Sequence, residues 1–249
     1  MDERERNMAQ RRMIDIHMHL IPGVDDGAYD RSMAETMLVM AHMQGVRAIF
    51  ATPHSSAFFY GHARVQEQFQ ALRSWLDATP LDMGLYLGCE VRCLPDGMES
   101  TLTALRQGIL PTLNGARYVL TEFQTGVLPA DAVRMTGRLL EEGWIPVVAH
   151  VERYPALFDG HTVRELTERG CLMQINAYSL EGESNEGITG AARGLLHEGL
   201  VTFLGSDAHR MDHRPPDVRT GLDYVYATCG RAYADAVAFG NAQKLLLCR

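Results

Sequence analysis

Short apolar runs rich in β-branched and aromatic residues recur along the chain, separated by longer stretches of mixed polarity. Each run is five to seven residues long and has the composition of a buried strand. The seven runs lie at residues 13–17, 47–53, 84–90, 117–123, 145–150, 171–176 and 201–206. The pattern therefore predicts seven strands.

The intervening stretches carry apolar residues at helical spacing. One begins near Ser32, with the capping box Ser32-x-x-Glu35, and ends at Gly45. A second helix is predicted from the spacing of Val65, Phe69, Leu72 and Leu76. Further helices are expected at 130–142, 163–169, within 181–199, and as one or two helices within 217–247.

Strands that alternate with helices indicate parallel β/α units. Seven units are one fewer than in the common eightfold barrel, so we expect a distorted (β/α)7 TIM-like barrel. This single α/β domain would span residues 13–249, after a disordered N-terminal extension at 1–12. The alternative is an open doubly wound sheet, which normally carries a glycine-rich phosphate loop, and neither GxGxxG nor GxxxxGK[ST] occurs.

Composition excludes several classes of protein. The chain has 31 acidic and 23 basic residues and a net charge of −8, which argues against nucleic acid as a partner. No apolar stretch is long enough to span a bilayer, and the N-terminus lacks the apolar core of a secretory signal, so no membrane insertion is expected. Five irregularly spaced cysteines are typical of unpaired thiols in the reducing cytoplasm.

Side chains of metal-ligand type close six of the seven predicted strands, and the sixth strand offers only Asn176. The carboxyl ends of barrel strands share one mouth, and residues two apart on a strand face the same way. The candidate ligands are His17, His19, Asp26, His54, Glu90, Glu122, His150, Asp207 and His209. Nine such ligands suit two or three ions of zinc, manganese or iron(II) with a bridging carboxylate.

Other polar residues near these positions are not expected to bind a metal ion directly, except that His213 is left open. Asp15 precedes His17 by two residues and is expected to accept a hydrogen bond from an imidazole. Asp25 is expected to make a hydrogen bond within its loop, and whether His213 borders the site stays open. The remaining histidines are expected at the surface: His42, His62, His161 and His197.

The strings that hold these residues resemble the polymerase-and-histidinol-phosphatase (PHP) superfamily. They are DIHMH at 15–19, ATPH at 51–54, GCE at 88–90, TEF at 121–123, AHVERY at 149–154 and GSDAHR at 205–210. Longer strings resemble the metal-dependent protein tyrosine phosphatases of bacterial capsule and exopolysaccharide operons: LPTLNGARYVLTEF at 110–123, RPP at 214–216 and NAQKLL at 241–246. The resemblance extends from Met13 to the C-terminus.

This resemblance implies three divalent ions, most commonly manganese, with iron or zinc as alternatives. The implied ligand sets are His17, His19, Glu90 and Asp207 for the first ion, Glu90, Glu122 and His150 for the second, and Asp26, His54 and His209 for the third. Arg153 and Arg214 match arginines that bind the substrate phosphate. Four ligand carboxylates against three divalent ions leave about two positive charges, which suits a phosphate dianion.

The implied reaction is hydrolysis of protein phosphotyrosine by attack of a metal-bound hydroxide on phosphorus. Asp207 or a nearby histidine is the candidate acid for the leaving oxygen. The implied substrate is the tail of a membrane-associated bacterial tyrosine kinase that controls capsule or exopolysaccharide synthesis.

Other functions predict different sequence features. A small-molecule phosphatase of the histidinol-phosphatase type would share the metal ligands, and a non-catalytic PHP-like binding domain would be expected to lose some of them. Many amidohydrolases use a carbamylated lysine within the barrel, whereas the only lysine here is Lys244. Neither the Cys-x5-Arg loop of cysteine phosphatases nor a G-x-S-x-G elbow occurs.

Overall fold

The computed structural model describes residues 11–182 and 185–247. Its parallel strands form a three-stranded sheet, β1-β2-β3, and a five-stranded sheet, β4-β5-β6-β7-β8. The strands are β1 (Met13–Met18), β2 (Val46–Ala51), β3 (Gly84–Leu87), β4 (Glu90–Arg92), β5 (Tyr118–Glu122), β6 (Ile145–Val148), β7 (Leu172–Asn176) and β8 (Phe203–Gly205). All seven predicted strands are confirmed.

The third predicted run is divided between two strands, because its two ends pair with different neighbours. Its first part, β3, pairs with β2, and its last residue, Glu90, begins β4 and pairs with Leu120 of β5. Gly88 lies at the break, where a Cβ atom would come within 2.9 Å of the Leu113 side chain. Glu90 therefore begins a strand, whereas the sequence predicted that it ends one.

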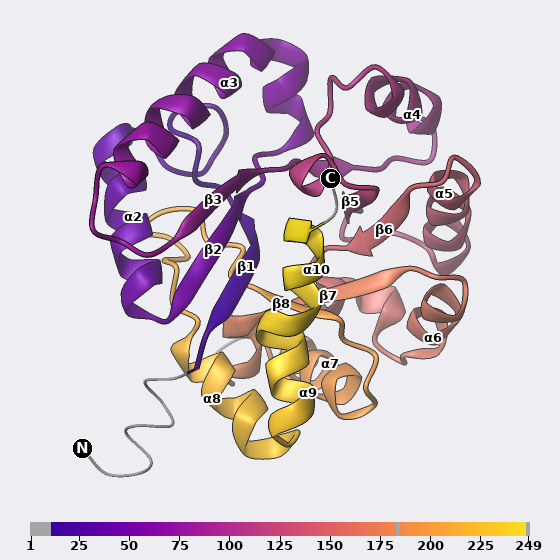
Figure 1. Ribbon diagram of the computed structural model, residues 1–249. Coiled ribbons are helices and arrows are strands. Elements are labelled where there is room, and N and C mark those ends of the chain that lie inside the picture. The colour runs from indigo at the N-terminus through magenta and orange to yellow at the C-terminus, as the bar shows by residue number, and fades with distance from the viewer. Residues whose placement is uncertain (1–10, 183–184, 248–249) are drawn as a thin grey trace.

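The two sheets adjoin along both pairs of edges. Isolated parallel bridges join Met18 to Ala208 and His54 to Glu90, and the amide of Asp207 donates to the carbonyl of His17 at 2.8 Å. The strands follow one another around a ring with helices outside it (Figure 1). The arrangement is the expected distorted TIM-like barrel, with its ladder interrupted at two places.

The helices follow the strands in the predicted order. They are α2 (Arg31–Met43), α3 (Ser55–Asp77), α4 (Met98–Arg106), α5 (Pro129–Glu141), α6 (His161–Glu168), α7 (Glu186–His197), α8 (Arg219–Thr228), α9 (Arg231–Asp235) and α10 (Asn241–Leu247). Short helical turns are η1 (Leu113–Gly115), η2 (Val151–Arg153), η3 (Pro155–Leu157), η4 (Ala177–Leu180) and η5 (Ala236–Gly240). Helix α4 was not predicted, because its N-cap is Gly97 and no side chain caps it.

The N-terminus of α2 is capped by a different residue from the one expected. Asp30 is the N-cap, and its carboxylate accepts a hydrogen bond from the amide of Met33 at 2.9 Å. Ser32 already lies within the helix, and Glu35 pairs with Arg31 at 2.6 Å. The predicted capping box is therefore wrong, because an aspartate two residues upstream binds the free amide.

The barrel interior is filled by its own apolar cluster, separate from the layer between strands and helices. It joins Ile14 and Ile16 of β1 with Phe203 of β8, and Ala242 and Leu245 of α10 pack against it. Figure 1 shows α10 lying across the centre of the ring. The interior is thus a packed core beneath the polar mouth, and α10 contributes to it.

A register shift in β1 changes which side chains face inward. Asp15 pairs with Ile49 and Met18 pairs with Ala51, so β1 has one more residue than β2 over this interval. Such a bulge re-aims the side chains that follow it. Ile14 and Ile16 therefore face the interior core, while His17 is also turned inward at the mouth.

The expected extension at residues 1–12 falls mostly outside the described part of the chain. Of its last two residues, Arg11 forms an ion pair with Asp223 and lies 4.4 Å from the ring centre of Tyr226. No helix within 11–182 or 185–247 combines the length and hydrophobicity that crossing a membrane would need.

Replacing the observed cap should destabilise the fold, whereas replacing the predicted cap should not. We expect Asp30→Ala to lower the free energy of unfolding by about 1 kcal/mol, because the Met33 amide loses its acceptor. The control Ser32→Ala, at an exposed helical position, should change it by less than about 0.5 kcal/mol. Urea unfolding measures both, and equal effects would contradict the assignment of the cap.

Candidate metal centre

A cavity of about 180 Å³ opens at the mouth of the barrel. Its lining contains seven of the nine predicted ligands and both predicted arginines: Asp26, His54, Glu90, Glu122, His150, Arg153, Asp207, His209 and Arg214. The other two ligands, His17 and His19, are fully buried and lie within 3.3 Å of Glu90. The structure therefore brings all eleven predicted site residues together.

Glu90 lies at the centre of this cluster and is 1% exposed. Its Oε1 atom lies 2.9 Å from His150 Nε2 and 3.3 Å from His17 Nε2. Its Oε2 atom lies 2.8 Å from His54 Nδ1 and 3.3 Å from His19 Nε2. Burial raises the pKa of Glu90, but the surrounding imidazoles outweigh burial and hold that pKa well below its usual range.

The two histidines of the first strand converge with Asp207. The Nε2 atoms of His17 and His19 lie 3.3 Å apart. Asp207 Oδ1 lies 3.4 Å from the first nitrogen and 3.6 Å from the second. Three ligand atoms that face one point at these separations can hold one cation.

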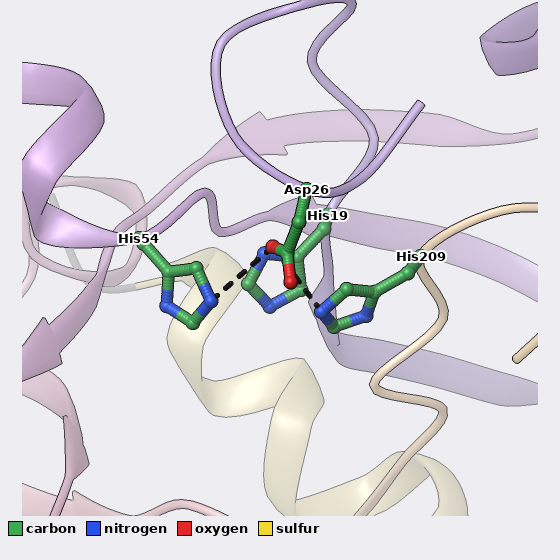
Figure 2. A group of neighbouring side chains, drawn as sticks. All are labelled: His19, Asp26, His54 and His209. Carbon is green, nitrogen blue, oxygen red and sulfur yellow. Dashed lines mark ion pairs between the residues drawn. The ribbon is translucent and has the colours of Figure 1, made fainter. Parts of the chain in front are cut away.

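A second group of ligand side chains also includes His19. Figure 2 shows Asp26 between His54 and His209, with His19 beside it. Asp26 Oδ1 lies 3.4 Å from His54 Nε2 and 3.6 Å from His209 Nε2. Hydrogen bonding to His54 lowers the pKa of Asp26, so this carboxylate is charged at neutral pH.

The described chain contains four groups of side chains that could each hold a cation. Within each group, the ligand atoms all lie within 4.8 Å of one another. The groups are His19, Asp26, His54 and His209; His17, Glu90 and His150; His17, His19 and Asp207; and His54, Glu90 and Glu122. The groups share members, and Glu90 belongs to two of them. This sharing is what a centre of several ions with a bridging carboxylate requires.

Two atoms of the cluster support cation binding independently of these distances. Glu122 Oε2 and His150 Nδ1 are buried and have no hydrogen-bond partner. Burial of such atoms is costly unless something coordinates them. Burial and the charge of Glu90 raise the pKa of Glu122. The cluster therefore fits divalent cations.

Asp25 has a larger role than a loop hydrogen bond. Its Oδ2 atom lies 2.8 Å from His19 Nδ1 and accepts from the amide of His54 at 3.0 Å. Its Oδ1 atom accepts from the amide of Gly27 at 3.0 Å. Because the Nδ1 atom of His19 is engaged by this carboxylate, Nε2 is directed at the cluster. The position of Asp25 next to the predicted ligand Asp26 was the sequence feature that could have indicated its contact with His19.

Gly27 permits this loop to lie against the first strand. A Cβ atom at residue 27 would come within 2.1 Å of the His19 carbonyl oxygen. The amide of Ala28 donates to the same carbonyl at 3.1 Å. Glycine is therefore required for Asp25 and Asp26 to reach the mouth.

Among the described residues, no imidazole nitrogen donates a hydrogen bond to Asp15, contrary to expectation. Its Oδ1 atom accepts from the amide of His17 at 3.1 Å and from the amide of Ser206 at 3.0 Å. The register shift after Asp15 separates its orientation from that of His17, so spacing by two does not place them on one face. Asp15 thus supports the backbone where β1 and β8 meet.

Three of the four non-glycine residues with positive φ among those described belong to this site. They are His150 at 34°, Asp207 at 52° and Arg214 at 54°. This conformation is unfavourable for ordinary residues and clusters at functional sites. His150 and Asp207 both follow the ends of strands, so the left-handed turn directs them into the mouth.

The two arginines meet at Asp207. Arg153 donates to Asp207 Oδ2 at 3.1 Å and Arg214 donates to the same atom at 2.6 Å. Although burial raises it, the pKa of Asp207 is lowered to about 2 by His17, His150 and Arg214. The lowered pKa keeps Asp207 ionised at neutral pH, as its expected role as a metal ligand requires.

The pKa values of His54 and His209 are shifted in opposite directions. Burial lowers the pKa of His54, but hydrogen bonds to Asp26 and Glu90 outweigh burial and raise it to about 10. Burial, His19 and Arg214 lower the pKa of His209 to about 3, so this ring is neutral. The neutral ring donates through Nδ1 to the carbonyl of Asp207 at 2.9 Å, and its Nε2 lone pair accepts from Arg214 at 2.8 Å.

The remaining histidines lie outside the cluster. His62, His161 and His197 are exposed and His42 is partly exposed, as expected. His213 is exposed and belongs to none of the four ligand groups.

Comparisons with known proteins agree with this geometry. Residues 13–247 match the family described as capsular polysaccharide synthesis, CpsB/CapC. The tyrosine-protein phosphatase CpsB of Streptococcus pneumoniae is 32% identical over 243 residues, which cover 94% of this chain and 98% of that protein.

Solved structures extend the similarity to three dimensions. A chain from the crystal structures of YwqE from Bacillus subtilis and CpsB from Streptococcus pneumoniae, described as unique metal-dependent tyrosine phosphatases, superposes with a TM-score of 0.82. The two chains are 29% identical, and the match covers 95% of this chain and 94% of that one. A β-aspartyl dipeptidase from Fervidobacterium islandicum AW-1, 14% identical with a TM-score of 0.62 over 94% of this chain and 74% of that one, shares the fold alone.

Removing the central carboxylate should abolish stabilisation by metal. We expect Mn²⁺ to raise the unfolding temperature of the wild-type protein, since a ligand at a hundredfold its Kd stabilises by about 2.7 kcal/mol. Glu90→Gln removes the shared anionic ligand, so its unfolding temperature should respond little to Mn²⁺. Differential scanning calorimetry measures both, with His161→Gln at an exposed site as the control. An undiminished response in Glu90→Gln would contradict the central role of Glu90.

Proposed function

The chain belongs to the CpsB/CapC family of capsular polysaccharide synthesis, and we propose that it is a metal-dependent protein tyrosine phosphatase. The carrying observation is the cluster of nine metal-ligand side chains beside two arginines at one cavity. Hydrolysis of a phosphate monoester requires cationic groups around the phosphoryl oxygens. The cavity concentrates such groups, and the similar protein CpsB of Streptococcus pneumoniae is named a tyrosine-protein phosphatase.

We propose three divalent ions, of manganese, with iron(II) or zinc as alternatives, because the donors are imidazoles and carboxylates. The proposed ligand sets are His17, His19, Glu90 and Asp207; Glu90, Glu122 and His150; and Asp26, His54 and His209. Bound ions of this kind stabilise phosphoryl oxygens as Lewis acids and lower the pKa of the attacking water. The distances from Glu90 to His17 and to His150 support its place as the shared ligand.

Arg153 and Arg214 are proposed to bind and orient the phosphate. Both side chains line the cavity, and each offers a planar set of N–H donors that matches phosphate oxygens. Their shared acceptor, Asp207 Oδ2, holds the guanidinium groups at the cavity wall. Asp207 is therefore proposed as a metal ligand that also positions the two arginines.

We favour phosphotyrosine over an alkyl phosphate, such as histidinol phosphate, as the substrate. The similar protein CpsB of Streptococcus pneumoniae is named a tyrosine-protein phosphatase, which supports this choice. Tyrosinate also leaves with little acid assistance because the phenol has a pKa of about 10, whereas an alkyl alcohol needs more.

The physiological substrate that we propose is the phosphotyrosine tail of a membrane-associated tyrosine kinase controlling capsule or exopolysaccharide synthesis. The family description supports the link to capsule synthesis, and the resemblance of the sequence motifs supports the kinase. We propose the cytoplasm as the compartment, because the cysteines are odd in number and irregularly spaced.

Activity should depend on metal and favour the aryl ester. We expect turnover of a phosphotyrosine peptide with Mn²⁺, loss of turnover after chelation and recovery when Mn²⁺ is restored, because the ions balance the phosphate charge. A parallel assay with histidinol phosphate should give the lower kcat/KM. Phosphate release measures both reactions, and His161→Gln serves as an active control.

Two results would overturn this function. Turnover that survives chelation would refute the metal-dependent mechanism. A clear preference for histidinol phosphate would favour a small-molecule phosphatase.

A further inference from the structure

Strand β7 carries no metal-type ligand, yet two of its buried side chains are carboxamides. Gln174 and Asn176 are both fully buried and lie two residues apart on the strand. Gln174 Nε2 donates to Asn176 Oδ1 at 2.8 Å. We propose that this amide pair is a positioning element that aims His17 and Asp207 at the metal centre.

The backbone amide of His150 determines which atom donates and which accepts in the hydrogen bonds of Gln174 and Asn176. It lies 2.9 Å from Gln174 Oε1, and a backbone amide can only donate, so this end of the Gln174 side chain must be the carbonyl oxygen. Gln174 Nε2 must then donate to Asn176, whose facing atom must be Oδ1. Both amide orientations therefore follow from one donor whose direction is known.

The orientation of the Gln174 carboxamide also determines the tautomer of His17. Its Nδ1 atom lies 3.1 Å from Gln174 Oε1, and since that oxygen only accepts, Nδ1 carries the hydrogen. In the neutral ring the lone pair then resides on Nε2, which faces Glu90 and Asp207. A first-strand histidine is thereby held in the form that can bind a cation from the side of the cavity.

The other end of the amide pair orients Asp207. Asn176 Nδ2 donates to Asp207 Oδ2 at 3.1 Å, the same oxygen that accepts from Arg153 and Arg214. Three donors on Oδ2 leave Oδ1 as the oxygen that faces His17. The pair thus directs one oxygen of Asp207 toward the arginines and the other toward the ligand group.

Neighbouring elements leave room for this arrangement and hold it. A Cβ atom at Gly205 would come within 2.9 Å of Gln174 Nε2 and 3.2 Å of His17 Cβ. The amide of Asn176 donates to Glu152 Oε1 at 3.0 Å, and Ser179 donates to the same oxygen at 2.7 Å. Gly205 therefore leaves room for the Gln174 side chain, and Glu152 holds the backbone of Asn176.

Gln174→Met should weaken metal binding beyond its effect on folding. The thioether keeps the volume but offers no strong acceptor, so His17 and the His150 amide lose their shared partner. Loss of such an orienting partner typically weakens metal affinity by about 10- to 100-fold. Isothermal titration calorimetry with Mn²⁺ on the folded, metal-stripped full chain measures the affinity.

A matched control separates positioning from general destabilisation. Ile175→Ala removes a fully buried apolar side chain from the same strand, between the two amides in sequence. We expect it to lower the unfolding temperature while leaving the Mn²⁺ affinity within about threefold of wild type, because it removes no hydrogen bond. Equal losses of affinity in Gln174→Met and Ile175→Ala would reduce the amides to a structural role.

A second variant keeps the test decisive if Gln174→Met does not fold. Asn176→Ser removes the donor to Asp207 Oδ2 but retains the backbone contact with Glu152, and should weaken Mn²⁺ binding by about tenfold. Wild-type affinity in a folded Gln174→Met or Asn176→Ser protein would overturn the proposal.

The inference rests on the proposed metal centre, and its failure can be told apart from failure of the phosphatase function. A wild-type protein that binds Mn²⁺ but hydrolyses no phosphotyrosine peptide would refute the function and leave the affinity comparison intact. Wild-type activity together with unchanged affinity in the variants would refute the inference alone. A wild-type protein that binds no Mn²⁺ would overturn both.

Discussion

The burial of one carboxylate at the junction of two sheets constrains both the fold and the site. Glu90 begins β4, bridges to His54 three residues beyond β2, and places both side-chain oxygens within 3.3 Å of imidazoles. A buried charge without such partners would be strongly unfavourable. The strands must therefore meet where the histidines can reach Glu90, so the packing of the barrel and the assembly of the centre are one problem.

A layer of fixed acceptors behind the imidazoles makes this assembly specific. Asp25 holds the rear nitrogen of His19, and Gln174 holds that of His17. Each contact directs the opposite nitrogen at the cluster, so the ligands are oriented by the protein itself. The same logic extends to Asp207, whose outer oxygen is held by the two arginines and an amide. Preorganisation of this kind reduces what a bound phosphate must rearrange.

The seven predicted runs overlap all eight strands and lead to all nine clustered ligands, because apolar runs mark buried strands and most of their polar ends share one mouth. It failed where three-dimensional details decide. A register shift turned Asp15 away from the imidazoles, and a cap at Asp30 replaced the predicted box. The contact of Asp25 with His19 depends on how the loop between them turns back, and the contact of Gln174 with His17 lies across the barrel, so neither was predicted. The polar pair Gln174 and Asn176, two residues apart in the otherwise apolar run 171–176, was the available clue to Gln174.

Anomalous diffraction at the manganese edge, from crystals grown with Mn²⁺, locates each ion bound by these side chains. We expect three anomalous peaks in the cavity at the barrel mouth, with Glu90 contacting two of them. One peak should lie beside His17 and His19 and another beside Asp26. Peaks confined to the protein surface, or a filled cavity in which Glu90 binds no ion, would contradict the account.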